Sequence, residues 1–316
     1  MIKFLVKIFV KNYENTSDPE VRKAYGIFSG VLGIFLNVFL FAVKLVTGFM
    51  MNSIAIISDA FNNLTDSASS VVTIFGANWS SKPPDKEHPY GHGRIEYIAS
   101  LVVAFIIFTV GLHLFSESVK KIISPEQVEL HVIAMAILIL SVFVKIWMFS
   151  YNQYIGRTIN STLNKAAAKD SLNDVIATTG VITGTIIGTY VDLPIDGILG
   201  LAISLLIMYT AFSTAKDSVY FLLGPSPDPE IYEKIEAIVE ESPIIRHCHD
   251  LHVHDYGPGK QMASMHVVVP TRLSVEKAHA HVHQLEERIK KELGIDIVIH
   301  IDPREGIDEQ LNNHGR

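Results

Sequence analysis

The sequence predicts an α-helical membrane protein with six transmembrane helices and a C-terminal cytoplasmic α/β domain of αββαβ order, as in ferredoxin-like or metallochaperone-like domains. Of its 316 residues, 48% are hydrophobic, and the mean hydropathy is positive at +0.29. The apolar residues are concentrated between Gly26 and Phe221, in segments of about 20 residues, the length that a helix needs to cross a bilayer. After Gly224 the composition is that of a soluble domain.

The six membrane segments are predicted at about 25–49, 53–78, 95–116, 131–153, 166–190 and 195–215. Basic residues are concentrated in the loops 80–94 and 151–169, whereas the intervening connections hold only Lys120 and Lys121. By the positive-inside rule, both termini are predicted to be cytoplasmic. We expect a protein integral to the membrane, and the plasma membrane is the expected location.

Four parts are predicted along the chain. Residues 1–20 form an amphipathic cytoplasmic arm without the long apolar region and cleavage site of a signal peptide. Residues 21–223 form the transmembrane domain, and the run Gly-Pro-Ser-Pro-Asp-Pro at 224–229 marks the boundary to a cytoplasmic metal-binding regulatory domain, 224–308. Residues 309–316 are a C-terminal tail.

The pattern of the cytoplasmic domain alternates between helix and strand. A helix at 229–242 is followed by a strand at 249–256, a Gly-Pro-Gly turn and a second strand at 260–269. A helix at 274–293 and a strand at 295–301 complete the order. This order predicts an open sheet with helices on one face.

Charge and cysteine content exclude some function classes. The formal net charge is −7, and no Lys/Arg-rich run is present, so nucleic acid is not an expected partner. The single cysteine, Cys248, excludes an internal disulfide and is expected to be reduced.

Polar residues inside two membrane segments are the main indication of function. Asn62 and Asp66 lie four residues apart in the second segment, and Asp170 and Asp174 repeat this spacing in the fifth. Residues four apart share one face of a helix, so the two pairs can form a four-ligand cage. A carboxylate near the bilayer centre costs about 3 kcal/mol or more, so such residues usually mark an ion path.

The donor types narrow the choice of ion. The four side chains offer only oxygen, which suits Mn²⁺, Mg²⁺ or Fe²⁺ better than Zn²⁺. Three crowded carboxylates repel one another, so at least one is expected to take up a proton when the metal leaves. Asp59, near one further turn away, is expected in the second shell or at a helix end.

Other interpretations of the same aspartates remain. They could lie at helix ends in the headgroup region. Aspartates spaced four apart also hold Mg²⁺ and a diphosphate in intramembrane transferases. That alternative requires further basic groups for the diphosphate, and the membrane segments offer few besides Lys145. We therefore expect no enzyme and no resident cofactor.

Three segments resemble the cation diffusion facilitator family: SIAIISDAFNNLTD, PPDKEHPYGHGRIE and AAAKDSLNDV, within a resemblance that covers about residues 20–305. The resemblance implies a homodimer of six-helix protomers that exports a divalent metal in exchange for protons. Zinc-transporting members commonly carry His or Asp in place of Asn62 and His in place of Asp170. The chain resembles the manganese-transporting branch instead, and Mn²⁺ is the leading expected substrate, ahead of Fe²⁺ and Zn²⁺.

Two further metal sites are expected outside the membrane. In the loop after the second segment, Asp85, His88 and His92 are spaced so that they can converge on one ion, unless they are chance residues of a polar loop. Arg94 and Glu96 are expected to anchor this loop, with Asp217 a candidate partner of Arg94.

Ten of the 14 histidines follow residue 224. By family resemblance, the ligands of a cytoplasmic site are expected to be His249, His279, His300 and Asp302. Other histidines, among them His266, are expected on the surface or at a dimer interface. An imidazole-rich site suits Zn²⁺ better than Mn²⁺, so the sequence indicates different ion preferences for its two halves.

Overall fold

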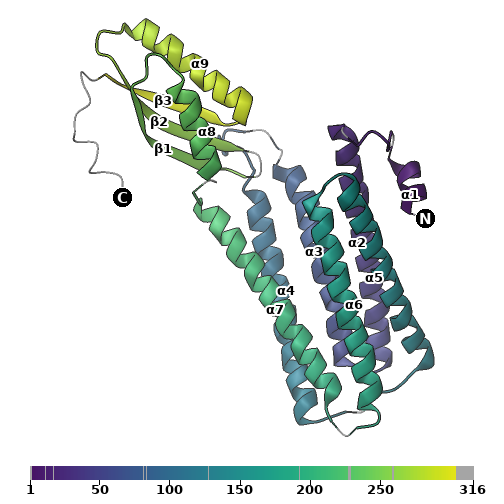
Figure 1. The fold of residues 1–316 in the computed structure, drawn as a ribbon. Helices are drawn as coiled ribbons and strands as arrows, with labels where there is room; N and C mark the ends of the chain where they lie inside the picture. Colours follow the sequence, from purple (N-terminus) through teal and green to yellow (C-terminus); the bar gives the residue numbers. More distant parts are fainter. Residues whose placement is uncertain are drawn as a thin grey trace. The chain divides into compact units, whose positions relative to one another are not determined.

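The computed structural model describes residues 2–10, 12–16, 18–80, 82, 84–126, 128–191, 193–226, 229–257 and 260–303. The predicted C-terminal tail at 309–316 lies outside the described residues. The described residues form nine helices and a three-stranded sheet, whose arrangement can be followed in Figure 1. The helices are α1 (Ile2–Phe9), α2 (Pro19–Met50), α3 (Ile54–Ser80), α4 (Ile95–Ile123), α5 (Val132–Thr158), α6 (Thr162–Gly188), α7 (Ile195–Leu223), α8 (Pro229–Glu240) and α9 (Val275–Leu293). The strands are β1 (His247–Asp255), β2 (Gln261–Val269) and β3 (Asp296–Pro303).

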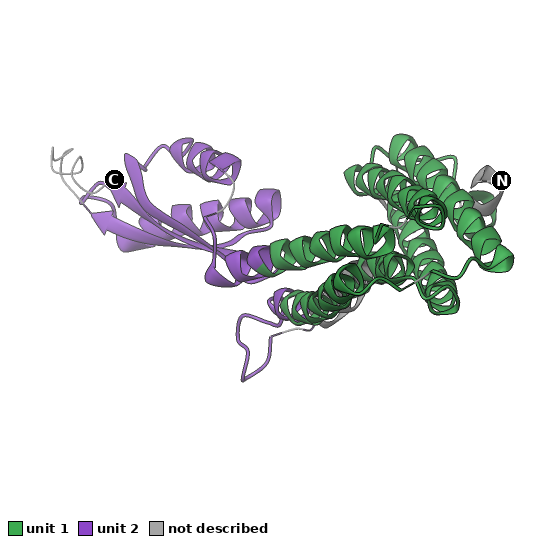
Figure 2. Cartoon of the chain, turned by 90° about the horizontal axis from the view of Figure 1, so that it is seen from below, with its two compact units in different colours: residues 1–74, 100–215 green, residues 75–99, 216–316 purple. Residues whose placement is uncertain are grey.

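The chain divides into two compact units, which Figure 2 shows in different colours. The helical unit comprises residues 1–74 and 100–215, and the α/β unit comprises residues 75–99 and 216–316. The loop between α3 and α4 therefore belongs to the same unit as the C-terminal domain.

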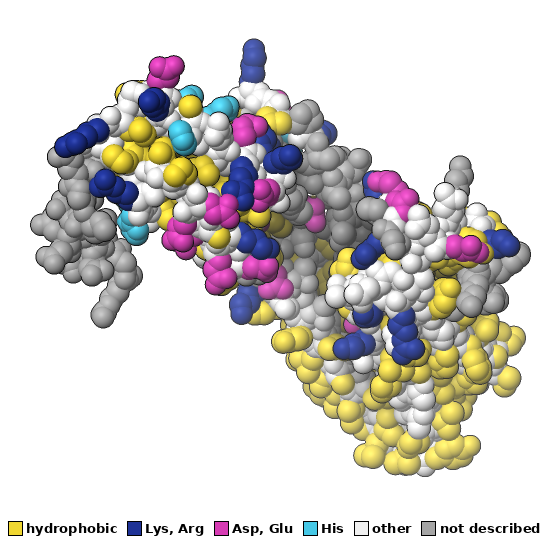
Figure 3. All heavy atoms as spheres, turned by 45° about the horizontal axis from the view of Figure 1, so that its top comes forward, with side chains coloured by type: hydrophobic (Ala, Val, Ile, Leu, Met, Phe, Trp, Pro, Cys, Tyr) yellow, Lys and Arg dark blue, Asp and Glu magenta, His cyan; other side chains and the backbone are white. Residues whose placement is uncertain are grey.

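Six long helices, α2 to α7, match the predicted membrane segments. Within the described residues, α2, α4, α5 and α7 are long and apolar enough to cross a membrane by length and composition. α3 and α6 are each 27 residues long. They carry the four polar residues Asn62, Asp66, Asp170 and Asp174 (the quartet), which lower the hydropathy of the two helices. Large apolar side chains such as Phe35, Phe105 and Phe143 are more than half exposed, and Figure 3 shows such side chains covering the helical unit. A helical membrane domain is thus confirmed.

Small residues allow the helices of this unit to approach closely. α5 packs against both α2 and α6. A Cβ atom on Gly200 would lie 2.8 Å from the side chain of Ile54, so α7 and α3 meet at this glycine. A Cβ atom on Gly184 would collide with the side chain of Leu199, so α6 and α7 meet there.

The C-terminal domain has the predicted αββαβ order. β1 pairs with β2 in antiparallel orientation, and β2 pairs with β3 in parallel orientation. α8 and α9 cover one face, where residues such as Ile235, Met265 and Ile289 form a buried core. Because side chains alternate along a strand, the other face of the sheet carries the residues between these core positions.

Candidate metal sites

The membrane quartet lies where α3 and α6 face each other. Asn62 Nδ2 donates to Asp174 Oδ1 at 2.9 Å, which joins the two helices. Asp174 is buried, whereas the side chain of Asp66, which follows Asn62 by one helical turn on α3, is 32% exposed. The i, i+4 spacing therefore places Asn62 and Asp66 on the α3 face that approaches Asp174.

A buried lysine occupies the space between the carboxylates. Lys145, on α5, is 1% exposed, and its Nζ forms a very close ion pair with Asp174 Oδ2. The same Nζ lies 3.5 Å from Asp66 Oδ2 and donates to Asn37 Oδ1 on α2 at 2.8 Å. Four helices, α2, α3, α5 and α6, thus contribute side chains to one polar cluster.

Asp170 stands apart from the other three members of the quartet. It lies one turn before Asp174 on α6 and is exposed. In the described part of the chain, no hydrogen bond or ion pair joins it to Asn62, Asp66 or Asp174, although Asp174 and Lys145 are its electrostatic neighbours. The structure therefore brings three of the four predicted residues into direct or lysine-mediated contact.

Asp59 belongs to a second buried cluster rather than contacting the quartet. Its Oδ2 lies 2.7 Å from Lys44 Nζ and accepts a hydrogen bond from Thr178 Oγ1 at 2.9 Å. Lys44 Nζ also lies 2.8 Å from Thr178 Oγ1. Since Lys44 and Asp59 are both almost fully buried, this pair compensates its own charge within the bundle.

A further buried carboxylate caps a helix. Asp196, in the first turn of α7, accepts hydrogen bonds from the backbone N–H of Ile54 at 2.9 Å and from Ser53 Oγ. Lys121 Nζ lies 3.2 Å from the same carboxylate. This arrangement satisfies N–H groups at the start of α3 that have no partner within the helix.

The loop between α3 and α4 brings its three predicted ligands together. Asp85 lies 3.4 Å from both His88 Nδ1 and His92 Nε2, and ligand atoms of the three residues lie within 4.8 Å of one another. Backbone N–H groups of His88 and Glu87 donate to Asp85, and the former is the main reason why the pKa of Asp85 is lowered. The His92 nitrogen that faces Asp85 is Nε2, whereas Nδ1 of the same ring is buried without a hydrogen-bond partner.

This loop is anchored to the end of β1 in the same unit. Arg94 donates through Nε and Nη2 to the backbone oxygen of Asp255, at 3.1 and 2.8 Å, and lies over the ring of Tyr256. A Cβ atom on Gly93 would collide with the backbone oxygen of Tyr256, so the contact requires glycine. Arg94 anchors the loop as expected, through Asp255 rather than Asp217.

Strand register creates a third cluster on the open face of the sheet. His249 is paired with His266 across β1 and β2, and His266 is paired with His300 across β2 and β3. His249 Nε2 and His266 Nδ1 each lie 3.1 Å from Asp302 Oδ2. His249, His266 and Asp302 form the group whose ligand atoms could hold a metal ion, and His300 Nε2 lies 3.7 Å from Asp302 Oδ1.

Two features of this cluster fit a cation. His249 Nε2 is buried and has no partner with hydrogen-bond geometry despite its proximity to Asp302. Burial alone would raise the pKa of Asp302, but the hydrogen bond with His266 and the nearby imidazoles lower it overall. The carboxyl group is therefore ionised at neutral pH, as a metal ligand must be.

The structure differs from the sequence-based ligand set at three histidines, because, among the described residues, His279 and His300 are not in the metal-competent group and His266 is. His279 lies exposed on α9, with its ring 6.1 Å from that of His283, and it is not part of the metal-competent group found among the described residues. His266, expected on the surface, contacts Asp302 directly. Strand pairing could have indicated His266, because it places the residue opposite both His249 and His300.

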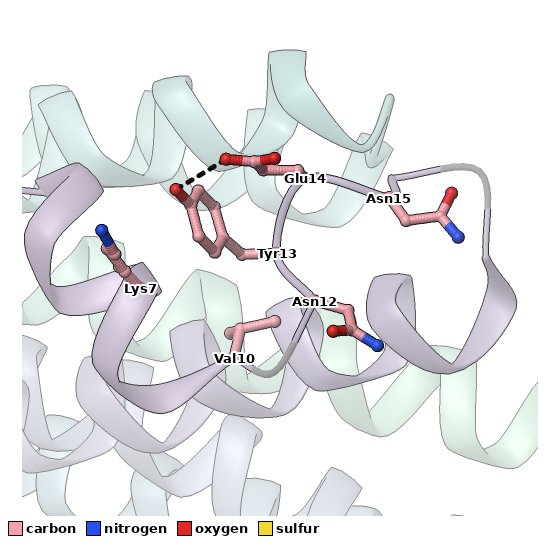
Figure 4. A pocket seen from close by; sticks show the side chains of 6 residues that line it. All are labelled: Lys7, Val10, Asn12, Tyr13, Glu14 and Asn15. Carbon is pink, nitrogen blue, oxygen red and sulfur yellow. Dashed lines mark hydrogen bonds between the residues drawn. The ribbon is translucent and has the colours of Figure 1, made fainter.

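A surface hollow of about 600 Å³ is lined by residues of the N-terminal arm. Figure 4 shows its lining, in which Tyr13 donates to Glu14 Oε1 at 2.9 Å. The lining residues are Lys7, Val10, Asn12, Tyr13, Glu14 and Asn15. No metal-competent group found among the described residues includes any of them.

A polar cluster between membrane helices, together with histidine–carboxylate clusters outside them, is typical of a membrane carrier of metal cations. The pattern of the cation efflux transmembrane domain matches residues 30–223, and that of the cation efflux cytoplasmic domain matches residues 227–304. The chain belongs to the cation efflux family, whose members are transporters rather than enzymes.

Relatives of this chain include proteins from bacteria and archaea. The manganese efflux system protein MneS of Bacillus subtilis is 30% identical over 287 residues, covering 90% of this chain and 98% of the relative. The uncharacterized transporter MJ0449 of Methanocaldococcus jannaschii is 29% identical, covering 83% and 91%. The cation-efflux pump FieF of Klebsiella pneumoniae is 25% identical, covering 84% and 88%.

Proposed function

We propose that the protein exports a divalent metal ion, with Mn²⁺ as the preferred substrate, in exchange for protons. Asn62, Asp66, Asp170 and Asp174 would form the transport site. The observation that carries this proposal is the approach of Asn62 and Asp66 to Asp174 between two membrane helices, with oxygen as the available ligand type. The relative named for manganese efflux supports the same ion.

Proton exchange follows from the charges of the site. When the ion leaves, Asp66 and Asp174 remain beside Lys145, the counter-charge identified among the described residues, and Asp170 lies one helical turn from Asp174. Like charges in a low-dielectric environment disfavour full ionisation, so proton uptake would accompany metal release. Alternating exposure of the site would then exchange the two cations.

We further propose that the protein works as a homodimer in the plasma membrane, with both termini in the cytoplasm. The loop cluster (Asp85, His88 and His92) and the sheet cluster (His249, His266 and Asp302) would bind regulatory metal. The match of residues 227–304 to the family's cytoplasmic domain supports the homodimer. Removal of residues from 225 onward should change the dependence of transport on metal concentration, and an unchanged dependence would refute the regulatory role.

Uptake of Mn²⁺ and Zn²⁺ into proteoliposomes under an imposed pH gradient tests the transport proposal. The native protein should carry Mn²⁺ in preference to Zn²⁺ and should move protons in the opposite direction. Asp174→Ala should abolish both fluxes, whereas Asp217→Ala, a change to a carboxylate outside the quartet, should retain them. Equal flux in native protein and Asp174→Ala would remove the quartet from the mechanism.

A further inference from the structure

The position of Lys145 suggests a role that extends the proposed transport cycle. Its side chain is 1% exposed in the middle of α5, and its Nζ contacts three oxygen-bearing side chains. Two of these, Asp66 and Asp174, are proposed ligands of the substrate, and the third is Asn37. The ammonium group therefore occupies a position from which it neutralises the ligands that a metal ion would use.

We propose that the Lys145 ammonium is a tethered cation that occupies the transport site between transport events and must move away before the metal ion can bind. This inference rests on the proposed function of the quartet. A divalent ion and an ammonium group repel each other strongly at short range in a low-dielectric interior, and both require the same carboxylate oxygens. Binding of one therefore opposes binding of the other.

Asn37 offers the displaced ammonium a place to remain. Its Oδ1 already accepts a hydrogen bond from Lys145 at 2.8 Å, and it lies on α2, outside the quartet. The long, flexible lysine side chain can move its charge without a shift of the backbone. Metal entry would thus transfer the ammonium from Asp66 and Asp174 toward α2.

The charge count agrees with this exchange. In the metal-bound state of the proposed site, three ionised carboxylates and the Lys145 ammonium would together carry a formal charge of −2, because −3 plus +1 equals −2. One divalent ion neutralises this charge while Lys145 stays protonated. Without the lysine, the same ligands would hold the ion with one excess negative charge, and release would be slower.

Lys44 provides a matched control. It is as deeply buried as Lys145, but it pairs with Asp59 and Thr178, which lie outside the quartet. Removal of either charge leaves a buried carboxylate without its partner and lowers stability. Only removal of Lys145 should also remove a competitor for the metal.

The test uses the full-length protein in lipid nanodiscs, with Asp85→Ala and Asp302→Ala to weaken the other two sites. Calorimetric titration with Mn²⁺ at one pH and one salt concentration measures the Kd. Lys145→Met should lower the Kd by at least about tenfold, which corresponds to about 1.4 kcal/mol. In proteoliposomes the same change should lower both the KM and the maximal flux, because metal release becomes slower. Lys44→Met should not tighten binding.

Asn37→Leu supplies a second test that keeps Lys145. Because the displaced ammonium loses its acceptor, this variant should bind Mn²⁺ more weakly than the native protein. An unchanged or higher Kd in Lys145→Met would overturn the tethered-cation role, and so would an unchanged Kd in Asn37→Leu if Lys145→Met does not fold. Asp174→Ala distinguishes the two proposals, since undiminished Mn²⁺ binding in that variant would refute the quartet itself.

Discussion

The membrane cluster and the sheet cluster both combine carboxylates with a positively charged or potentially charged partner, but they use different chemistry. In the membrane, Asp66 and Asp174 face the permanent charge of Lys145 and offer oxygen ligands. On the sheet, Asp302 faces His249 and His266, whose imidazoles can themselves bind a metal. A hard ion such as Mn²⁺ suits the former, and Zn²⁺ suits the latter.

The two regions also differ in how the backbone sets the ligand positions. Helical spacing fixes the ligands within α3 or α6, and the contact between the helices then completes the cluster. On the sheet, hydrogen-bonded strand pairing sets His249, His266 and His300 side by side. The membrane cluster can therefore change when helices move, whereas the sheet cluster is held by backbone pairing across β1, β2 and β3.

The largest expected difference between the regions is in transport. Loss of an outer-sphere partner already lowers metal affinity by roughly 10–100-fold, so Asp66→Ala should lower Mn²⁺ flux by at least about 100-fold. Asp302→Ala should retain flux and alter its dependence on metal concentration. Parallel flux assays check this contrast, and equal losses in both variants would contradict the separation into a transport site and a regulatory site.

A ligand exchange should move the membrane site toward the chemistry of the sheet site. Asp170→His adds an imidazole, which should raise the preference for Zn²⁺ over Mn²⁺ by roughly tenfold. Competition between the two ions in the flux assay measures this ratio. Lys169→His, which places an imidazole at the neighbouring position, is the control, and the same shift in both variants would argue against Asp170 as a ligand.

In the C-terminal domain, alanine substitutions of His266 and of His279 should have different effects on Zn²⁺ binding. His266→Ala should weaken Zn²⁺ binding to the full-length protein by about tenfold or more, because it removes a contact to Asp302. His279→Ala should have a smaller effect, since its side chain lies away from this cluster on α9. Titration of both variants tests the assignment, and the reverse order would restore the ligand set expected from the sequence.

The smallest expected effect concerns Cys248, next to the sheet cluster. Burial, followed by the charges of Glu236 and Glu240, raises the pKa of its thiol. The reactive thiolate should therefore form only at higher pH than in a free cysteine, and alkylation at neutral pH should be severalfold slower. Alkylation rates measured against pH check this, and a rate equal to that of an unfolded control would contradict the effect of burial.

The sequence predicted the membrane domain and the αββαβ domain because both depend on local periodicity and segment length. The approach of α3 to α6 was also foreseeable, since Asn62, Asp66 and Asp174 are polar residues at helical spacing within apolar segments. Lys145 and Lys44 were harder to place. Their partners depend on how each helix is rotated in the bundle, which periodicity within one helix does not determine.

Strand register explains why the sequence did not predict His266 as a member of the histidine cluster in the C-terminal domain. The spacing of histidines along one strand does not reveal which residue lies opposite on the next strand. The register shift between His249 and His252 makes this pairing still less regular. The contact between Arg94 and the backbone of Asp255 joins residues far apart in the sequence, so residue spacing alone could not predict it.

Pulsed electron paramagnetic resonance of bound Mn²⁺ tests most directly whether oxygen ligands of α3 and α6 hold the transported ion. The measurement uses protein with Asp85→Ala and Asp302→Ala, so that the signal comes from the membrane site. We predict a bound ion without the nitrogen hyperfine modulation of an imidazole ligand, and loss of this signal in Asp174→Ala. Imidazole modulation, or an equal signal after Asp174→Ala, would contradict the account.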